Sequence, residues 1–127
     1  DCYSATPDPM EATLAVRGGM APEGRRFAVL GSMLELGDYA EEGHRRAGRA
    51  AAKHADALYA YGPDAAAMVA GAKENGMEHA YAFDDQIALA AALRQDAKPG
   101  DALLFKGSRG MRMERALAMF LGEDVEE

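Results

Sequence analysis

The sequence predicts an α/β fold in which a mostly parallel sheet carries helices on both faces. Four short apolar runs recur along the chain, and each is continuous rather than alternating, which is typical of parallel strands buried on both sides. Segments with helical periodicity lie between these runs, and strands that alternate with helices form parallel sheets through right-handed crossovers. The predicted strands are residues 27–30, 57–61, 80–83 and 102–105.

Turn and capping residues place the first helices. Residues 1–6 are interpreted as the exit from an earlier strand. An Asp-Pro pair at 8–9 and a Gly pair at 18–19 bound a first predicted helix, because Pro is favoured at the first helical position and Gly just past the last. A second helix is predicted from Asp38 to about Ala55. Its small apolar residues form a narrow face that would let it lie close to a sheet.

Three more helices are predicted after the second, third and fourth strands. The segments around Met68 and Leu117 carry apolar residues at positions i, i+3, i+4 and i+7, the spacing of a buried helix face. The predicted N-caps are Asp64, Asp84 and Ser108, and the predicted stops are Gly76 and the pair 99–100. The acidic tail 122–127 is expected to fray.

Length, charge and cysteine content exclude several classes of protein. The chain has 127 residues, enough for one domain, and 21 acidic against 14 basic side chains give it a net charge of −7. A general nucleic-acid binder is basic instead, and no apolar run is long enough to span a membrane. Cys2 is the only cysteine, which excludes an internal disulfide and a cysteine-cluster metal site. The histidines at 44, 54 and 79 lack the spacing of a helical zinc pair, so no metal site is predicted.

The residues that follow the last predicted strand form a candidate anion site. Ligands of open α/β sheets bind beyond the carboxyl ends of the strands. Lys106, Ser108 and Arg109 place two cations and a hydroxyl there, just before a predicted helix whose N-terminus favours an anion. A carboxylate or phosphate would suit this corner. The spacing equally allows Ser108 to be only an N-cap and the cations to be solvated. A P-loop is excluded, because Phe105 stands where that motif requires Gly.

A basic stripe runs along the second predicted helix. It consists of Arg45, Arg49 and Lys53. Glu41 and Glu42 precede Arg45 and Arg46 by four residues, which is the spacing of helical ion pairs. The stripe is therefore interpreted as a solvated, salt-bridged face, and docking of a partner is the alternative.

Three strings together resemble the C-terminal domain of the MurF group of the Mur ligase family. DCYSATP at 1–7 resembles the opening Asp-x-Tyr-Asn-Ala-Asn-Pro of that domain. GSMLELG at 31–37 is similar to its Gly-Asp-Met-Leu-Glu-Leu-Gly, with His44 and Gly48 matching beyond it. KGSRGMRME at 106–114 is similar to its Lys-Gly-Ser-Arg-x-Met-x-x-Glu. The strings occur in order and with similar spacing, and the resemblance extends from residue 1 to about 121.

The resemblance implies a single Rossmann-like domain over 1–127, the third of three in a UDP-N-acetylmuramoyl-tripeptide:D-alanyl-D-alanine ligase of the bacterial cytoplasm. Such a ligase uses ATP and magnesium to convert a carboxylate to an acyl phosphate, which the amine of D-Ala-D-Ala attacks during synthesis of the peptidoglycan precursor. The central domain supplies the P-loop and the magnesium ligands, and the C-terminal domain closes over it. We therefore expect this chain to bind no cofactor and to be inactive by itself. Because it begins with Asp1 rather than Met, we expect other domains to precede it.

Family roles carry over to matching positions only. The match at Asp1 implies a contact near the ATP ribose at the domain junction. Ser4 and Thr6 are implied to lie on the same nucleotide side, and they stand where the family has Asn. In the substrate loop, Ser32 replaces an Asp of the family, so Glu35 is the candidate for orienting the incoming ammonium.

The catalytic assignment goes to the string that follows the last strand. Lys106, Ser108 and Arg109 match the family fully, and we assign them to the carboxylate end of the dipeptide and to charge that develops in the transition state. His44 and Glu35 also match, and bracing of the loop is their alternative role.

Two other readings stay open at this point. One is a stand-alone or degenerate α/β module that binds a small anionic ligand. The other is an interaction domain that docks a partner through its acidic surface and basic stripe. The departures from the family at positions 4, 6 and 32 also allow a changed dipeptide preference.

Overall fold

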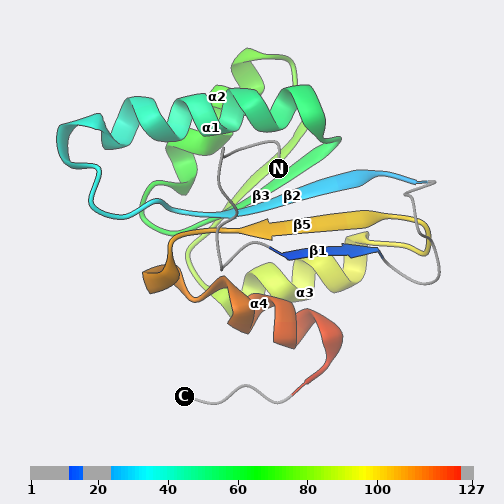
Figure 1. The fold of residues 1–127 in the computed structure, drawn as a ribbon. Coiled ribbons are helices and arrows are strands. Elements are labelled where there is room, and N and C mark those ends of the chain that lie inside the picture. The colour runs from blue at the N-terminus through cyan, green and yellow to red at the C-terminus, as the bar shows by residue number, and fades with distance from the viewer. Residues whose placement is uncertain (1–11, 16–23, 124–127) are drawn as a thin grey trace.

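The computed structural model describes residues 12–15 and 24–123, where strands alternate with helices (Figure 1). None of the described helices is long and apolar enough to cross a membrane. In chain order the elements are β1 (Ala12–Ala15), β2 (Arg26–Gly31), the 3₁₀ turn η1 (Gly37–Tyr39), α1 (Ala40–His54), β3 (Ala57–Tyr61), α2 (Ala65–Glu74), β4 (His79–Phe83), α3 (Gln86–Asp96), β5 (Ala102–Lys106), the 3₁₀ turn η2 (Arg109–Met111) and α4 (Met113–Leu121).

The sheet has the strand order β1-β5-β2-β3-β4, and β2 to β5 are all parallel. This confirms the predicted mostly parallel α/β sheet. From β2 the chain moves outward through β3 and β4 and then returns to place β5 on the other side of β2. The strand order therefore reverses between β2 and β5. Such a switch point is where open α/β sheets form a ligand crevice, at the carboxyl ends of the two strands.

The first predicted helix is wrong over residues 12–15, which form β1. This strand pairs antiparallel with β5, in the register Ala12 to Phe105. Without β1, the strand β5 would expose a row of unpaired backbone groups at the sheet edge. Pairing satisfies these groups, but the partner lies some ninety residues away, so local capping signals could not reveal it. The rest of that predicted helix and residues 1–6 lie outside the described residues.

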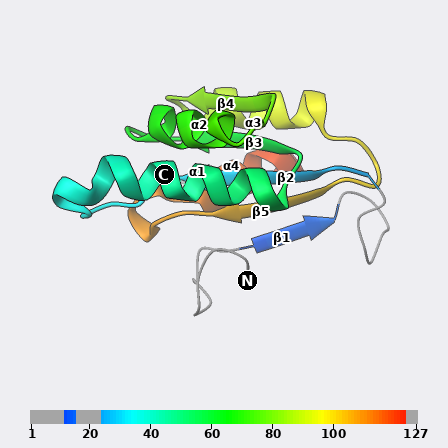
Figure 2. The ribbon, with the colours of Figure 1, turned by 90° about the horizontal axis from the view of Figure 1, so that it is seen from above.

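Helices cover both faces of the sheet, as predicted, with two described helices on each face. Figure 1 shows α1 and α2 above the sheet and α3 and α4 below it, and Figure 2 shows that α1 and α2 leave β5 and β1 uncovered by helices from above. The lower core is built of large side chains such as Phe27, Leu103 and Phe105. The upper core is mostly alanine, with Leu58 and Met68 as its larger members.

Small residues let the two upper helices touch through their backbones. A Cβ atom on Gly48 of α1 would lie 1.9 Å from the carbonyl oxygen of Met68 in α2, and one on Gly71 would lie 2.0 Å from that of Arg45. Of the predicted narrow face of α1, Ala51 is buried in the core above the sheet, whereas the tightest approach of the helix, at Gly48, is to the backbone of α2.

Ion pairs fasten the outer surface of the same helices. Glu74 of α2 pairs with both Arg45 and Arg49 of α1, which also pair with Glu41 and Glu42 respectively. The interpretation of the stripe as a salt-bridged face is confirmed for these two arginines. The expected pairing of Glu42 with Arg46 is wrong, because Glu42 turns to Arg49 instead.

A buried carboxylate fastens the amino end of β2, opposite to the switch point. Asp101 accepts hydrogen bonds from the backbone N–H groups of Arg25 and Lys98, at 2.7 and 2.8 Å, and the Arg25 guanidinium lies 3.4 Å away. Burial works to raise the pKa of Asp101, but these hydrogen bonds and the charge of Arg25 hold it below its ordinary value.

Some predicted helix ends differ from the observed ones. Asp85, not Asp84, caps α3, because its carboxylate accepts from the N–H groups of Ile87 and Ala88. The expected fraying is wrong for residues 122 and 123. Gly122 and Glu123 donate to the carbonyls of Met119 and Ala118 and so close the last turn of α4. Residues 124–127 lie outside the described chain.

Candidate functional site

The loops that follow β2 and β5 meet at the switch point. Leu30 pairs with Lys106 in the parallel register, so the two strands deliver their loops side by side. The Leu34 N–H donates to the Ser108 Oγ at 3.0 Å, which joins the loops directly. The structure thus brings together the predicted substrate loop and the predicted catalytic string.

Three successive N–H groups of the first loop already have partners. The Ser32 N–H donates to the Tyr61 carbonyl at 2.9 Å, and the Met33 N–H donates to Nε2 of His44 at 2.7 Å. The Leu34 N–H is taken by Ser108. Converging free N–H groups are what makes a loop into an anion cradle. Residues 32–34 offer none, so their backbone does not form such a cradle.

His44 braces this loop from beneath. Its ring is fully buried, and Nδ1 lies 2.6 Å from the Ala40 carbonyl while Nε2 accepts from Met33. Since Nε2 is an acceptor, the proton sits on Nδ1 and the ring is the neutral tautomer. Asp64 Oδ2 lies 3.8 Å from Nε2. The side chain fixes the loop and does not face a ligand.

The other two residues of the predicted substrate loop have different surroundings. Ser32 is fully buried: its hydroxyl donates to the Tyr61 carbonyl at 3.2 Å and accepts from the Asp64 N–H at 3.0 Å. Both capacities of the hydroxyl are therefore used by backbone. Glu35 is exposed and has a left-handed backbone with φ of +67°. Within the described chain, no hydrogen bond or ion pair engages its carboxylate.

The second loop presents Lys106, Ser108 and Arg109 in turn. Lys106 is half-buried at the end of β5, and Arg109 is exposed on η2. Ser108 accepts from Leu34, and no described residue faces its hydroxyl hydrogen as an acceptor. The expectation that these residues lie just before the last helix is wrong. The turn η2 and Arg112, in the left-handed region with φ of +53°, intervene before α4 begins at Met113.

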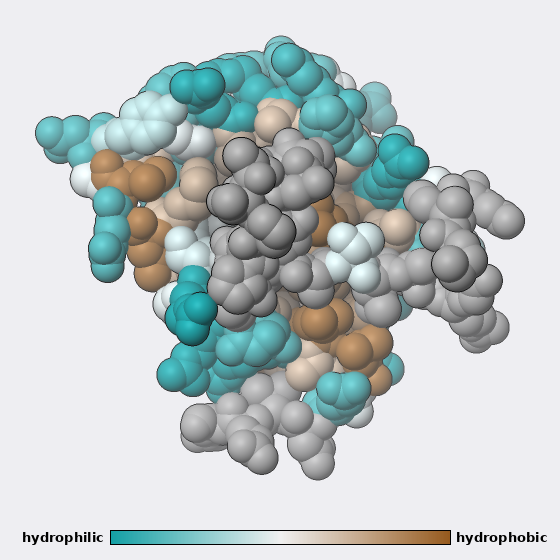
Figure 3. Space-filling view, viewed as in Figure 1, coloured by the Kyte–Doolittle hydropathy of each residue, from teal (hydrophilic) through white to brown (hydrophobic). Residues whose placement is uncertain are grey.

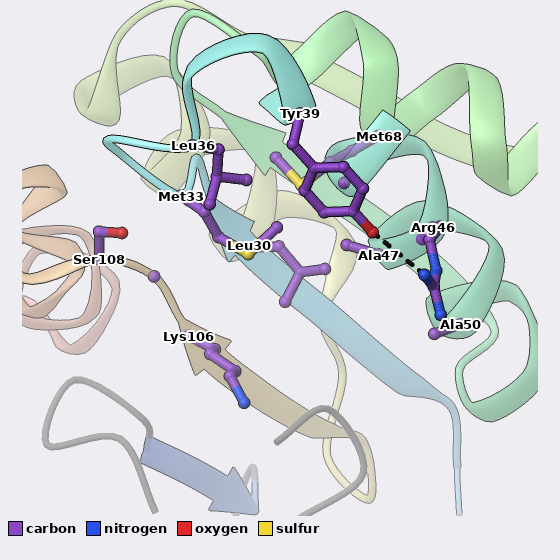
Figure 4. A pocket seen from close by; sticks show the side chains of 13 residues that line it. Leu30, Met33, Leu36, Tyr39, Arg46, Ala47, Ala50, Met68, Lys106 and Ser108 are labelled. Carbon is purple, nitrogen blue, oxygen red and sulfur yellow. Dashed lines mark hydrogen bonds between the residues drawn. The ribbon is translucent and has the colours of Figure 1, made fainter. Parts of the chain in front are cut away.

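A cleft of about 520 Å³ lies beside Lys106, under the first turns of α1 (Figure 4). Among the described residues that line it, two are cationic, Arg46 and Lys106, and none is acidic. Its remaining lining consists of Leu30, Gly31, Met33, Leu36, Tyr39, Gly43, Ala47, Ala50, Met68, Gly107 and Ser108. The cleft can therefore hold a small ligand that has an apolar body and a negative charge.

Sequence analysis missed Tyr39 and Arg46 as candidate residues of the site. The Arg46 guanidinium donates to the Tyr39 hydroxyl at 3.1 Å across the mouth of the cleft (Figure 4). Among the described residues Arg46 has no acidic partner, whereas Arg45 and Arg49 have two each. The only sequence signal was its position beside the basic stripe, one residue away from Arg45.

Apolar side chains come to the surface at the same end of the molecule. Figure 3 shows them gathered where the loop that follows β2 lies. Leu34 and Tyr39 are 40% and 46% exposed there, which is high for large apolar residues. The predicted nucleotide-side residues Asp1, Ser4 and Thr6 lie outside the described residues. Across the described ranges, no three His, Cys, Asp or Glu side chains converge as a metal site.

Comparisons with known proteins point to one family. The family model described as "Mur ligase, glutamate ligase domain" matches residues 1–109. The UDP-N-acetylmuramoyl-tripeptide–D-alanyl-D-alanine ligase of Bacillus subtilis is 34% identical over 116 residues, which are 90% of this chain and 25% of that ligase. The ligase of the same name from Synechocystis is 40% identical over 122 residues, or 92% of this chain and 26% of that ligase. The chain thus spans about a quarter of the length of these curated relatives.

Solved structures agree with the sequence comparisons. The MurF ligase of Thermotoga maritima, crystallised in complex with ADP, aligns with a TM-score of 0.65 and 33% identity over 80% of this chain and 23% of its own. A MurF structure from Acinetobacter baumannii aligns with a TM-score of 0.68 and 28% identity, over the same shares of the two chains. Both structures are thus similar to this chain in sequence as well as in fold.

Proposed function

The chain belongs to the Mur ligase family, and on that premise we propose that it is the C-terminal domain of a ligase that joins D-Ala-D-Ala to UDP-N-acetylmuramoyl-tripeptide. The reaction would form an amide, with ATP converted to ADP and phosphate, in bacterial peptidoglycan synthesis. The observation that carries this proposal is the meeting of the 31–37 and 106–110 loops at the switch point, joined from Leu34 to Ser108.

We assign ATP and magnesium to a part of the enzyme that this chain does not contain. The chain has no P-loop, and the N–H groups of residues 32–34 are already hydrogen-bonded within the domain. No described residues converge as a magnesium site. When ATP and magnesium are bound by the rest of the enzyme, they supply the activated acyl group.

The charged side chains of the second loop would bind and orient the dipeptide. Lys106 and Arg109 give the site two positive charges, which suit a carboxylate and also the negative charge that develops on the oxygen of an attacked acyl group. Ser108, held in place by the Leu34 N–H, has a hydroxyl hydrogen left to donate. The small apolar lining of the adjacent cleft suits methyl side chains such as those of D-Ala-D-Ala.

The first loop would keep these groups in register and shield them. Because His44 and Ser32 tie the loop down from beneath, Leu34 and Glu35 are presented at the surface. Glu35 is the carboxylate that could receive the incoming ammonium, since the side chain of Ser32 is buried and already paired. The exposed apolar groups beside it would help exclude water when the domains close, which protects an acyl phosphate from hydrolysis.

The test uses the intact enzyme and two substitutions. We expect Lys106→Met and Arg109→Met each to raise KM for D-Ala-D-Ala or to lower kcat, with kcat/KM down by about tenfold or more, in an assay of ADP release. Lys98→Met is the matched control, because this exposed lysine lies in the turn at the opposite end of β5. Wild-type kinetics in both site variants would refute the assignment.

The gene offers an independent check. A reading frame upstream of the Asp1 codon should encode a domain with a P-loop. If no such domain accompanies the chain, the remaining function is a module that binds small anions in the cleft beside Lys106.

A further inference from the structure

We propose that Gln86 is a positioning residue that holds the Arg109 turn in the geometry the ligase needs. The inference rests on the proposed function, because the turn carries a predicted catalytic side chain. Gln86 is the first residue of α3, which follows β4, and it belongs to neither of the two loops that form the site.

The side-chain amide of Gln86 spans two successive carbonyls. Its Nε2 lies 2.8 Å from the Met111 oxygen and 3.1 Å from the Arg112 oxygen. Each hydrogen of the amide group can therefore serve one carbonyl. The start of α3 is itself fixed, because Asp85 caps it through the N–H groups of Ile87 and Ala88. Gln86 thus holds the end of the turn, at Met111 and Arg112, in a fixed position relative to α3.

The orientation of this amide is determined by its surroundings. If the group were flipped, Oε1 would face two carbonyl oxygens, and acceptors repel one another. In the observed orientation Oε1 is buried and finds no hydrogen-bond donor among the described residues. A buried polar atom without a partner is unfavourable and rare in folded proteins. The two hydrogen bonds that Nε2 donates offset this cost.

The two carbonyls flank the least favourable backbone of the loop. Arg112 has φ of +53° and ψ of +50°, a left-handed conformation that is unfavourable for residues other than Gly. Before it, Ser108 is anchored to the Leu34 N–H. The turn is therefore held at both ends, and Arg109 lies between the anchors with no ion pair inside the described part of the chain. Its backbone is fixed while its guanidinium is available.

A double-mutant cycle in the intact ligase tests this role. Gln86→Met removes both donors and the unpartnered acceptor at similar side-chain length. We expect it to lower kcat/KM by about tenfold in the wild-type background and by less than about twofold when Arg109→Met is already present, because the effect passes through Arg109. Gln95→Met, at an exposed position of the same helix, is the control and should leave kcat/KM unchanged. Equal losses in both backgrounds, or no loss at all, would overturn the proposal.

Hydrogen exchange on the 127-residue chain separates this inference from the proposed function. Met111 and Arg112 donate their N–H groups within the turn, to Ser108 and Arg109. Gln86→Met should speed their exchange severalfold and leave the amides in the middle of α3 unchanged. If the wild-type ligase does not use D-Ala-D-Ala, the proposed function fails and the exchange result alone decides the positioning role, with unchanged rates refuting it. If Gln86→Met does not fold, Gln86→Asn replaces it, because its shorter side chain cannot bring the amide to the Met111 and Arg112 carbonyls. The same changes in exchange rate and in kcat/KM are then expected.

Discussion

Replacing Gly48 by alanine should force α1 and α2 apart. The new Cβ would lie 1.9 Å from the Met68 carbonyl oxygen and 2.9 Å from the Ala72 nitrogen, whereas real contacts of this kind stay above 3.0 Å. Both neighbouring atoms belong to the α2 backbone, so no side chain can rotate out of the way. The helices must separate, and their separation would also loosen the pairs that Glu74 makes with Arg45 and Arg49.

The expected net effect is a loss of about 2 kcal/mol in the free energy of unfolding. Overpacking costs about 1–3 kcal/mol in well-packed interiors, and a backbone clash belongs at the upper end of that range. Alanine recovers about 1 kcal/mol of this, because it is the better helix former. For a domain of this size, the net loss lowers Tm by roughly 8 °C.

Urea and thermal unfolding of the chain, followed by far-UV circular dichroism, would measure this change. Gly43→Ala is the matched control, because it lies in the same helix but its Cβ would meet only the side chains of Tyr39 and Leu36, at 2.9 and 3.0 Å. These side chains can shift, so we expect the control to stay within about 1 kcal/mol of wild type. Stability of Gly48→Ala at or above that of wild type would show that the backbone contact is not as tight as the structure indicates.

Two further predictions concern a strained residue and a buried charge. Glu35→Gly should raise the free energy of unfolding by about 0.5–1 kcal/mol in urea titrations, because Gly adopts φ of +67° without the penalty that Glu pays; a loss would argue against that conformation. Asp101→Asn should lower it by about 2 kcal/mol at pH 7, since hydrogen bonds from Arg25 and Lys98 favour the ionised carboxylate. The pKa of Asp101 is depressed in the folded state, so its stabilisation is present above the unfolded pKa and is lost as the pH falls through the folded one. The gap between the variant and wild type should therefore narrow below about pH 4, and a gap independent of pH would refute the role of the charge.

The strands were predictable because their signal is local. The runs at 27–30, 57–61, 80–83 and 102–105 differ from the observed strands by no more than one residue at either end. The strands β2 and β3 are buried on both faces, and this requires apolar residues at successive positions, which is visible within five residues of sequence. The strands β4 and β5 have similar apolar runs, but the expectation of burial on both faces is wrong for them, because several of their residues are exposed or only partly buried. The two loops of the site followed from the same pattern, because ligands bind where parallel strands end.

The first strand and the start of the last helix were not predictable in this way. Residues 12–15 become a strand only because β5 needs a partner at the sheet edge. The start of α4 moves to Met113 because Arg112 takes a left-handed conformation, and its carbonyl is held by Gln86 from another helix. In both cases the deciding partner is distant along the chain.

By itself, then, the sequence determined the strands β2 to β5, the helices between them and the two loops that meet at the switch point. Those features depend on which residues avoid water and on spacing within a single turn or strand. Only the tertiary structure decided that Ser108 accepts a hydrogen bond from the Leu34 N–H and that His44 accepts one from the Met33 N–H. It also decided that Arg46 lines the cleft. Each of these depends on the direction of a side chain across a gap between elements. Packing of the whole domain sets that direction, and no local pattern encodes it.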